Sequence, residues 1–227
     1  MWNGNNKALT FSYDDGISQD IRLVEIFNKY GMKCTFNLNS GIMNENGNFQ
    51  IGDVPVTRIT KDLLPEVYKG HEIAVHTLTH PSLTELNDDE IRREIMQDKL
   101  NLERILGTEI CGMAYPYGTF NDKVIKIAEE CGIKYSRTVF DAESFAPQNN
   151  LMEFRATCHH KNERLWELLE SFLAYKGDEP AIFCLWGHSY EFDVDNNWKH
   201  IEEFCQKAGG RDDVFYGTNS EGLLNKI

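Results

Sequence analysis

The chain of 227 residues is 41% hydrophobic and 26% charged, and it carries a formal net charge of −13 at pH 7. This composition is typical of a globular protein with a sizeable core. The acidic balance argues against a nucleic acid or an anionic membrane as partner, because both would need a basic surface. No repeat, low-complexity tract or Pro/Ser-rich linker divides the chain, so we expect one domain over residues 1–227.

The cysteines and the N-terminal sequence indicate in which cellular compartment we expect the protein. Six cysteines occur without any C-x-x-C pair, and several lie in apolar runs, as buried thiols do. We therefore expect reduced core cysteines rather than disulfides. No run is long and apolar enough to span a bilayer, and residues 1–7 lack the basic-then-apolar build of a signal peptide. These features predict a cytoplasmic protein with no membrane partner.

Short apolar runs alternate with amphipathic stretches, the pattern of parallel strands joined by helical crossovers. Strands are predicted at 8–13, 33–38, 72–75, 110–115, 134–139, 153–157, 181–186 and 214–216. Helices are predicted at 18–31, 60–69, 87–107, 124–131, 165–172 and around 198–205, with loops at 39–58 and 140–152. About seven strand–helix units in this length indicate a closed or nearly closed (β/α) barrel, in which the chemistry lies at the C-terminal ends of the strands.

The first predicted strand ends in two adjacent carboxylates, Asp14 and Asp15, followed by Gly16. Neighbouring carboxylates at a strand end repel each other, and a bound cation would offset that cost. Taken alone, Asp-Asp-Gly is more typical of a solvated turn. Its interpretation therefore depends on what the other strand ends carry.

Two histidines, His76 and His80, follow the third predicted strand. Four positions apart, they can face one site if the segment coils into a helical turn. By itself this spacing also suits two surface or capping histidines. Combined with the aspartate pair at another strand end, it predicts a site of two histidines and one aspartate with open positions for water and substrate.

The fourth predicted strand runs into the turn Tyr115-Pro116-Tyr117-Gly118. Proline fixes φ and glycine permits a tight turn, so the segment can aim a backbone N–H into a cavity and form an oxyanion hole. A plain strand-to-helix turn is the simpler interpretation of these residues in isolation.

A histidine, His188, follows the strongly apolar seventh strand and its terminal Trp186. Its pKa lies near working pH, which makes it a candidate general acid, and Glu191 can orient it. A capping or core histidine is an equally good interpretation of His188 without further context.

Together these clusters resemble the polysaccharide deacetylase family, the NodB-homology or family 4 carbohydrate esterases. The resemblance spans residues 8–216 and rests on Ser12-Tyr13-Asp14-Asp15-Gly16, His76-Thr77-Leu78-Thr79-His80-Pro81, Tyr115-Pro116-Tyr117-Gly118 and His188. It implies a distorted (β/α)7-type barrel of parallel strands with outer helices. It also implies removal of acetyl groups from an N-acetylated or O-acetylated carbohydrate.

The resemblance assigns a role to each matching residue. Asp14 would be the catalytic base, His188 the general acid, and Tyr117 the donor of a backbone N–H to the oxyanion. A divalent metal, Zn²⁺ first and Co²⁺, Ni²⁺ or Mn²⁺ as alternatives, would be held by Asp15, His76 and His80. The part of the site that binds the oxyanion and the substrate would also include Pro116, Tyr115 and Trp186.

Two positions depart from the family pattern. The arginine that usually stands two residues before the third motif's proline is replaced by Ala114. Either the base lacks its ionic partner, which would leave its pKa higher, or Arg137 or Arg155 substitutes from another strand. The family's aspartate-and-tryptophan motif has only a loose counterpart in residues 141–145, with Phe145 as an apolar wall. These departures favour a non-catalytic carbohydrate-binding relative, whereas the presence of both a base and an acid favours the enzyme.

Overall fold

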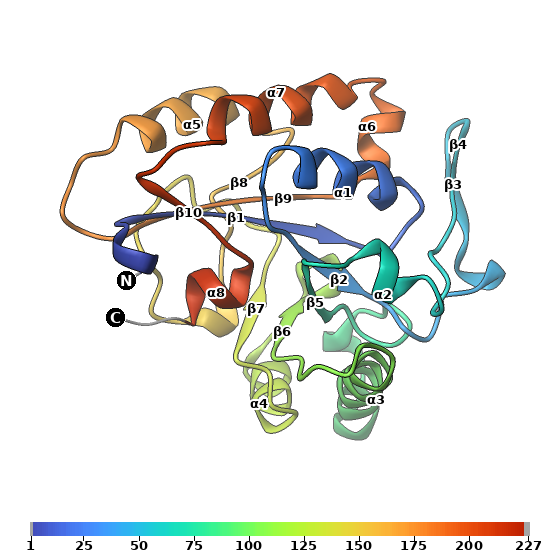
Figure 1. Cartoon of the computed structure of the whole chain (residues 1–227). Coiled ribbons are helices and arrows are strands. Elements are labelled where there is room, and N and C mark those ends of the chain that lie inside the picture. Colours follow the sequence, from blue (N-terminus) through green and yellow to red (C-terminus); the bar gives the residue numbers. More distant parts are fainter. Residues whose placement is uncertain (1, 225–227) are drawn as a thin grey trace.

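A curled parallel sheet forms the centre of the molecule in the computed structural model, which describes residues 2–224 (Figure 1). Its strands are β1 (Lys7–Asp14), β2 (Thr35–Leu38), β5 (Glu72–Val75), β6 (Gly112–Ala114), β7 (Tyr135–Arg137), β8 (Cys158–His159), β9 (Ala181–Gly187) and β10 (Val214–Tyr216). They run in the order β7-β6-β5-β2-β1-β9-β8, and β10 pairs with the first residues of β1. All of these pairs are parallel.

The two ends of the sheet come close enough together to make a distorted barrel. Arg137, at the end of β7, forms an isolated parallel bridge with Phe154, which precedes β8. Phe154 N donates to Ser136 O at 3.0 Å, and Thr138 N donates to Phe154 O at 2.8 Å. The predicted α/β class and the distorted barrel of parallel strands with outer helices are therefore confirmed.

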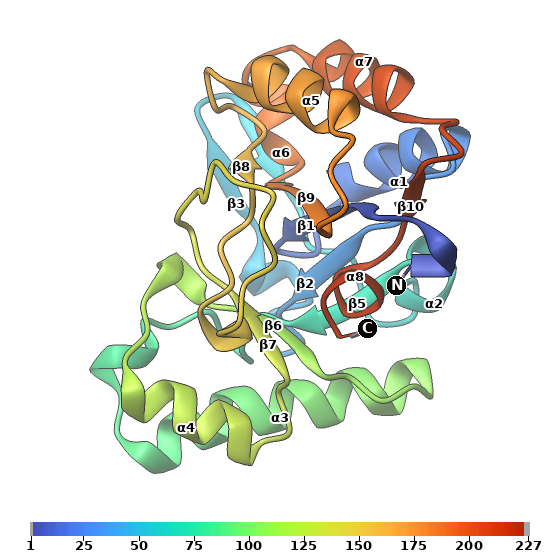
Figure 2. The same ribbon diagram turned by 90° about the vertical axis from the view of Figure 1, so that its left-hand side faces the viewer.

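Helices cover both sides of the sheet (Figure 2). They are α1 (Gln19–Lys29), α2 (Leu64–Val67), α3 (Asp88–Leu106), α4 (Asp122–Glu130), α5 (Leu165–Ala174), α6 (Tyr190–Val194), α7 (Trp198–Ala208) and α8 (Asn219–Leu223). One side carries α1, α5 and α7, and the opposite side carries α3 and α4. None of the helices between residues 2 and 224 has both the length and the hydrophobicity needed to cross a bilayer.

Helix α3 begins and ends where its sequence predicts. Asn87 and Glu90 form a capping box at its N-terminus, which satisfies backbone N–H groups that have no partner inside the helix. Gly107 ends it with a φ of 69°, a conformation that glycine adopts at little cost.

The core follows from the apolar strands β1 and β9, which are buried along their whole length. Phe11 and Phe183 both pack against Phe204 of α7, with ring centroids 5.8 and 5.7 Å away. Burying each such ring contributes about 1.5–3 kcal/mol. All six cysteines are free, and five of them are buried, as expected from their apolar surroundings.

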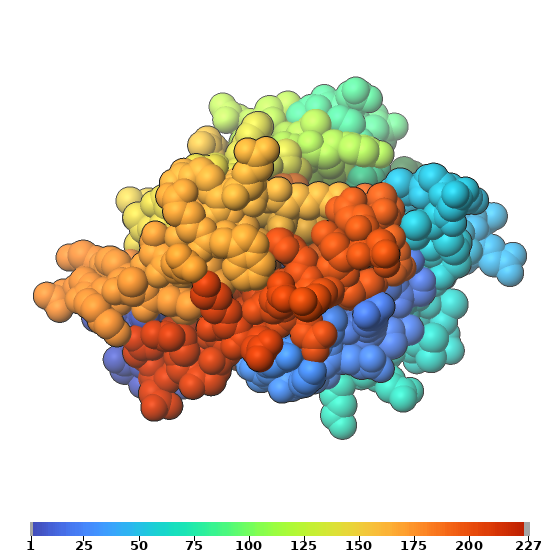
Figure 3. Space-filling model, turned by 90° about the horizontal axis from the view of Figure 1, so that it is seen from above, coloured from blue at the N-terminus to red at the C-terminus, as the bar shows by residue number. Residues whose placement is uncertain are grey.

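The predicted loop 39–58 contains a hairpin, which corrects that prediction. Strands β3 (Phe49–Ile51) and β4 (Val54–Val56) pair antiparallel. Gly52 has a φ of 57° in the turn between them. The strands are short and half exposed, so they lack the apolar run that marks a buried strand. The hairpin lies at one edge of the molecule beside α6 (Figure 3).

The predicted sixth strand, 153–157, is also misplaced. Residues Leu151–Glu153 form a short 3-10 helix, and the strand β8 comes later, at Cys158–His159. Pairing with β9 decides this, because Cys158 lies opposite Leu185 and His159 opposite Trp186. Local apolar content does not encode that register.

Candidate active site

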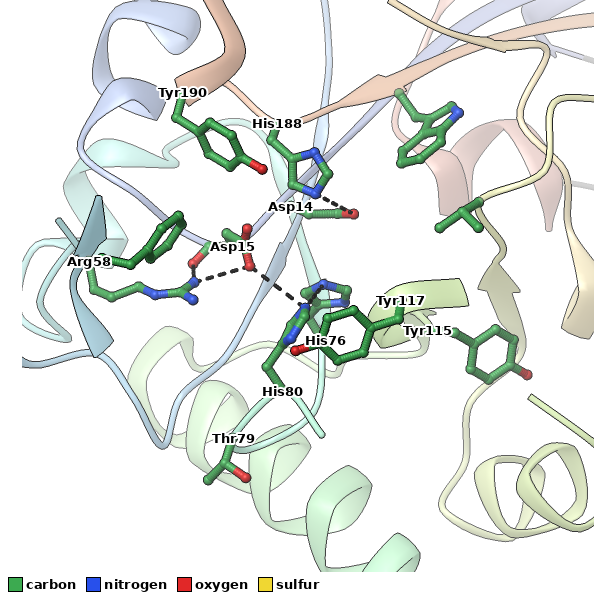
Figure 4. Close-up of a pocket in the computed structure, with 13 residues that line it drawn as sticks. Asp14, Asp15, Arg58, His76, Thr79, His80, Tyr115, Tyr117, His188 and Tyr190 are labelled. Atoms are coloured by element: carbon green, nitrogen blue, oxygen red, sulfur yellow. Dashed lines mark hydrogen bonds and ion pairs between the residues drawn. The ribbon is translucent and has the colours of Figure 1, made fainter. Parts of the chain in front are cut away.

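A cavity of about 490 Å³ opens at the carboxyl ends of the barrel strands (Figure 4). Polar side chains line it from four of these ends, after β1, β5, β6 and β9. The predicted site residues among them are Asp14, Asp15, His76, His80, Tyr117 and His188. Residues up to 174 positions apart in the sequence therefore meet at one place, where parallel barrels usually carry their chemistry.

Three of these residues form a group able to hold a metal ion: Asp15, His76 and His80. The two Nε2 atoms of the histidines are 3.1 Å apart, and His80 Nε2 lies 3.9 Å from Asp15 Oδ1. Bonds of about 2.0–2.1 Å in a tetrahedron place ligand atoms roughly 3.3 Å apart, so these separations suit a common ion. His76 Nδ1 lies 2.8 Å from Ala114 O, where it donates, and this leaves the Nε2 lone pair free for a ligand.

The loop that presents the two histidines is not a helical turn. Thr77 and His80 both have left-handed backbones, with φ of 67° and 62°. His80 N donates to Thr77 Oγ1 at 3.1 Å and closes the loop on itself. The i, i+4 spacing thus brings the imidazoles together by a strained loop, which corrects the helical geometry that the spacing suggested.

The protonation states of the two histidines fit a metal. Burial lowers the pKa of His76, and burial together with the neighbouring His76 lowers the pKa of His80 to about 4. Both imidazoles are therefore neutral at pH 7 and able to act as ligands. Asp15 is ionised, since the charges of His188 and Arg58 outweigh the effect of burial and lower its pKa.

Asp14 is paired with Arg137 rather than with Arg155. Burial alone would raise the pKa of Asp14, but the Arg137 guanidinium, bonded to Asp14 Oδ2, holds it well below its usual range. Arg137 is the register partner of Ala114 on the neighbouring strand β6. Arg137 on β7 thus supplies the guanidinium that position 114 on β6 lacks. Arg155 is exposed and lies over the ring of Phe140.

His188 lies beside Asp14 in the cavity (Figure 4). Its Nε2 lies 3.9 Å from Asp14 Oδ2, and its Nδ1 lies 3.5 Å from Glu191 Oε2. Burial alone would lower the pKa of His188, but the carboxylates of Glu191, Asp14 and Asp15 raise it to about 9. His188 is therefore protonated where Asp14 is ionised, the arrangement that general acid–base catalysis needs.

The turn after β6 is strained at Tyr117, whose φ is 57°. Tyr117 is 65% exposed, and its ring stands edge-on to His80 at 4.6 Å. Gly118 is required beside it, because a Cβ there would meet Val139 at 2.3 Å. Pro116 is buried within the turn.

The other two predicted substrate-side residues lie at the cavity wall with their polar atoms occupied. Tyr115 is buried, and its hydroxyl donates to Met152 O at 2.9 Å. Trp186 covers the Arg137 guanidinium, 4.4 Å from the ring, and its Nε1 donates to Asp141 Oδ1 at 2.8 Å. Phe145 is only half-buried, packs against Phe172 of the core and does not line the cavity, so the prediction that it forms an apolar wall of the site is wrong.

Sequence reasoning missed the wall residues Phe49, Arg58 and Val139, and it considered Tyr190 only as one of several aromatic rings on which a sugar could stack. The rings of Phe49 and Tyr190 meet edge-on at 5.7 Å, so the hairpin and α6 together form one side of the cavity. Arg58 donates to the backbone O of Asp15, lies 3.3 Å from its Oδ1, and reaches Asn39 Oδ1 at 3.2 Å. No local motif marks Phe49 or Arg58, because only the packing of the hairpin brings them here.

Comparison with known proteins places the chain in a family. The family model for polysaccharide deacetylase matches residues 3–136, more than half of the chain, and the chain belongs to this family. It is 31% identical over 123 residues to chitin deacetylase 1 of Cryptococcus neoformans, covering 54% of this chain and 23% of that protein. It is 27% identical over 128 residues to a peptidoglycan-N-acetylglucosamine deacetylase of Bacillus cereus, covering 56% and 42%. Each match spans less than half of the relative's length.

Solved structures share the fold. The chitin deacetylase of Colletotrichum lindemuthianum has a TM-score of 0.63 at 19% identity, covering 98% of this chain and 89% of that one. A CE4 family pseudoenzyme of Bacillus anthracis has a TM-score of 0.57 at 21% identity, covering 98% and 66%. The fold is thus found in both an enzyme and a pseudoenzyme, and activity has to be argued from the site.

Proposed function

We propose that this chain is a metal-dependent hydrolase that removes acetyl groups from an N-acetylated, or O-acetylated, carbohydrate. One observation carries the proposal: the cavity brings Asp14, paired with Arg137, and His188 together beside the triad Asp15, His76 and His80. A carbohydrate-binding module has little use for a base and an acid set 3.9 Å apart beside a ligand group.

Asp14 is the proposed base. Its pairing with Arg137 and the bond from Asn37 Nδ2 to its Oδ1 at 2.7 Å fix the carboxylate in place and keep it ionised. It would take the proton of the attacking water. His188, protonated and held by Glu191, would then give its proton to the departing amine. Steps of this kind each contribute about 10²–10⁴-fold in rate.

Asp15, His76 and His80 would hold the metal, for which Zn²⁺ is the first candidate and Co²⁺, Ni²⁺ or Mn²⁺ are alternatives. When bound, the ion would supply a Lewis acid that polarises the acetyl carbonyl and acidifies water. The backbone N–H of Tyr117, in its strained turn beside His80, would donate to the oxyanion that forms on the substrate.

The proposed substrate class rests on the relatives and on the cavity walls. The relatives are named for chitin and for peptidoglycan N-acetylglucosamine, both of which carry acetamido sugars. Aromatic rings of Phe49, Tyr190 and Trp186 line the cavity, as faces on which sugars stack. An acetamido sugar, free or within a polymer, is therefore the first substrate to test.

The first measurement is the metal content of the purified chain, beside the variants Asp15→Asn and His80→Ala. Near-stoichiometric zinc in the wild type and its loss in both variants is the expected result. Acetate release from acetylated chito-oligosaccharides and peptidoglycan fragments is then measured, with Asp14→Asn as the inactive control. A wild type that binds neither zinc, cobalt nor nickel would refute the hydrolase and leave the carbohydrate-binding alternative.

A further inference from the structure

Helix α3 carries two buried acids on the face that packs against the barrel. Glu94 is 2% exposed and Asp98 is fully buried, one turn apart, and the other buried residues of the helix are Ile91, Ile95, Lys99 and Leu102. The buried face of a helix is normally apolar. Two carboxylates are kept in such a position only if they are well bonded.

Their bonds go to the loop that carries the two histidine ligands and, for Asp98, also to Ser40 after β2. Asp98 Oδ2 accepts from His76 N at 3.2 Å, and its Oδ1 accepts from Ser40 N at 2.6 Å. Glu94 Oε2 accepts from Thr79 N at 2.8 Å, and its Oε1 accepts from Thr79 Oγ1 at 3.0 Å. The backbone O of Glu94 also accepts from Leu78 N at 2.9 Å. Thr79 lies directly before His80 at the edge of the site over α3 (Figure 4).

This loop needs to be held from outside. Left-handed backbones at Thr77 and His80 cost about 1–3 kcal/mol each and persist only where surrounding contacts enforce them. The N–H of His76 donates to Leu38 O of β2 at 2.8 Å, and α3 offers it a second acceptor, whereas the N–H groups of Leu78 and Thr79 have their acceptors on α3.

We propose that Glu94 and Asp98 are positioning residues of the metal site, which hold the imidazoles of His80 and His76 in ligating geometry. The inference rests on the proposed function, in which these histidines bind the ion. Removal of groups that orient metal ligands typically lowers metal affinity by about 10–100-fold. The same loss is expected here, although neither carboxylate reaches the cavity.

The two carboxylates differ in how they tolerate an amide. The Glu94 oxygens accept from one N–H and one hydroxyl, and Oε1 also lies 3.7 Å from the guanidinium of the exposed Arg93. The hydroxyl of Thr79 can turn to accept from an amide NH₂. Both oxygens of Asp98 face backbone N–H groups, so an amide there sets a donor against a donor. Glu94→Gln should therefore bind metal nearly as the wild type does, whereas Glu94→Ala and Asp98→Asn should not.

The test is titration of the metal-free chain with Co²⁺, followed by its visible absorption and by calorimetry. We expect affinity to fall about 10–100-fold, with an altered spectrum, in Glu94→Ala and Asp98→Asn, and to change less than about threefold in Glu94→Gln. Gln97→Ala, on the exposed face of the same helix, is the matched control. Urea unfolding shows whether each variant is folded. If Asp98→Asn is unfolded, the comparison of Glu94→Ala with Glu94→Gln decides the test.

The outcomes separate the two proposals. Wild-type affinity and spectrum in Glu94→Ala would overturn the positioning role while leaving the metal site intact. A Glu94→Gln variant as weak as Glu94→Ala would overturn it too, because the hydrogen-bond pattern would then not be what matters. A wild type that binds no metal would instead refute the proposed function.

Discussion

Replacing Arg137 with alanine removes the cation that keeps Asp14 ionised. Asp14 is 3% exposed and Arg137 1% exposed, so the carboxylate would be left buried without a charged partner of comparable strength. Breaking such a buried pair costs about 3–5 kcal/mol of the free energy of unfolding. Loss of an adjacent opposite charge raises the pKa of a carboxyl by about 1–3 units.

The raised pKa of Asp14 changes the pH range in which the enzyme is active. A base acts only when it is ionised, and a raised pKa of Asp14 leaves it protonated up to a higher pH. The acid limb of the kcat/KM profile should therefore move up by about 1–3 pH units in Arg137→Ala. Because the pKa of Asp14 starts well below its usual range, the assay is acetate release between pH 2 and 10 by wild type and variant, with folding checked at each pH by circular dichroism.

A matched control is available in Arg155→Ala, because Arg155 is exposed and contacts Phe140 rather than Asp14. It should leave the acid limb in place. The double variant Ala114→Arg/Arg137→Ala moves the guanidinium to the partner position on β6. Its acid limb should return toward the pH at which it lies in the wild type. An acid limb that does not move in folded Arg137→Ala would refute the assignment of Arg137 as the partner of the base.

Three further changes have defined outcomes. Glu191→Gln removes a carboxylate that raises the pKa of His188 to about 9, so the alkaline limb of kcat/KM should move down by about 1–3 pH units. Burial raises the pKa of Asp20 from 3.8 to about 7, so its protonated form is favoured in the fold and stability is lost as pH rises from 4 to 7. That loss is on the order of 4 kcal/mol and should be absent from Asp20→Asn in urea unfolding at each pH. Phe49→Ala removes a ring from the cavity wall away from the reacting groups, and should raise KM about 2–12-fold with kcat unchanged in steady-state kinetics.

Local sequence was enough to predict most of the strands and the residues at their ends. A buried strand is recognisable by its continuous apolar run, as in β1 and β9, and a helix by its caps, as at Asn87 and Gly107 of α3. Strand ends that carry Asp14 and His188 could be found because each cluster is contiguous in the chain and its chemistry depends on residue type. The barrel then places these ends on one side.

Tertiary structure alone decided which groups pair across the site. Arg137 is 123 positions from Asp14, and only the β6–β7 register shows that it takes the place of a side chain missing at Ala114. The hairpin that brings Phe49 and Arg58 to the cavity has only three residues in each strand, so its alternation of apolar and exposed positions is too short to identify it from the sequence. Local patterns report burial and turn geometry, whereas partners at long sequence separation are selected by how strands and loops pack, which no short segment encodes.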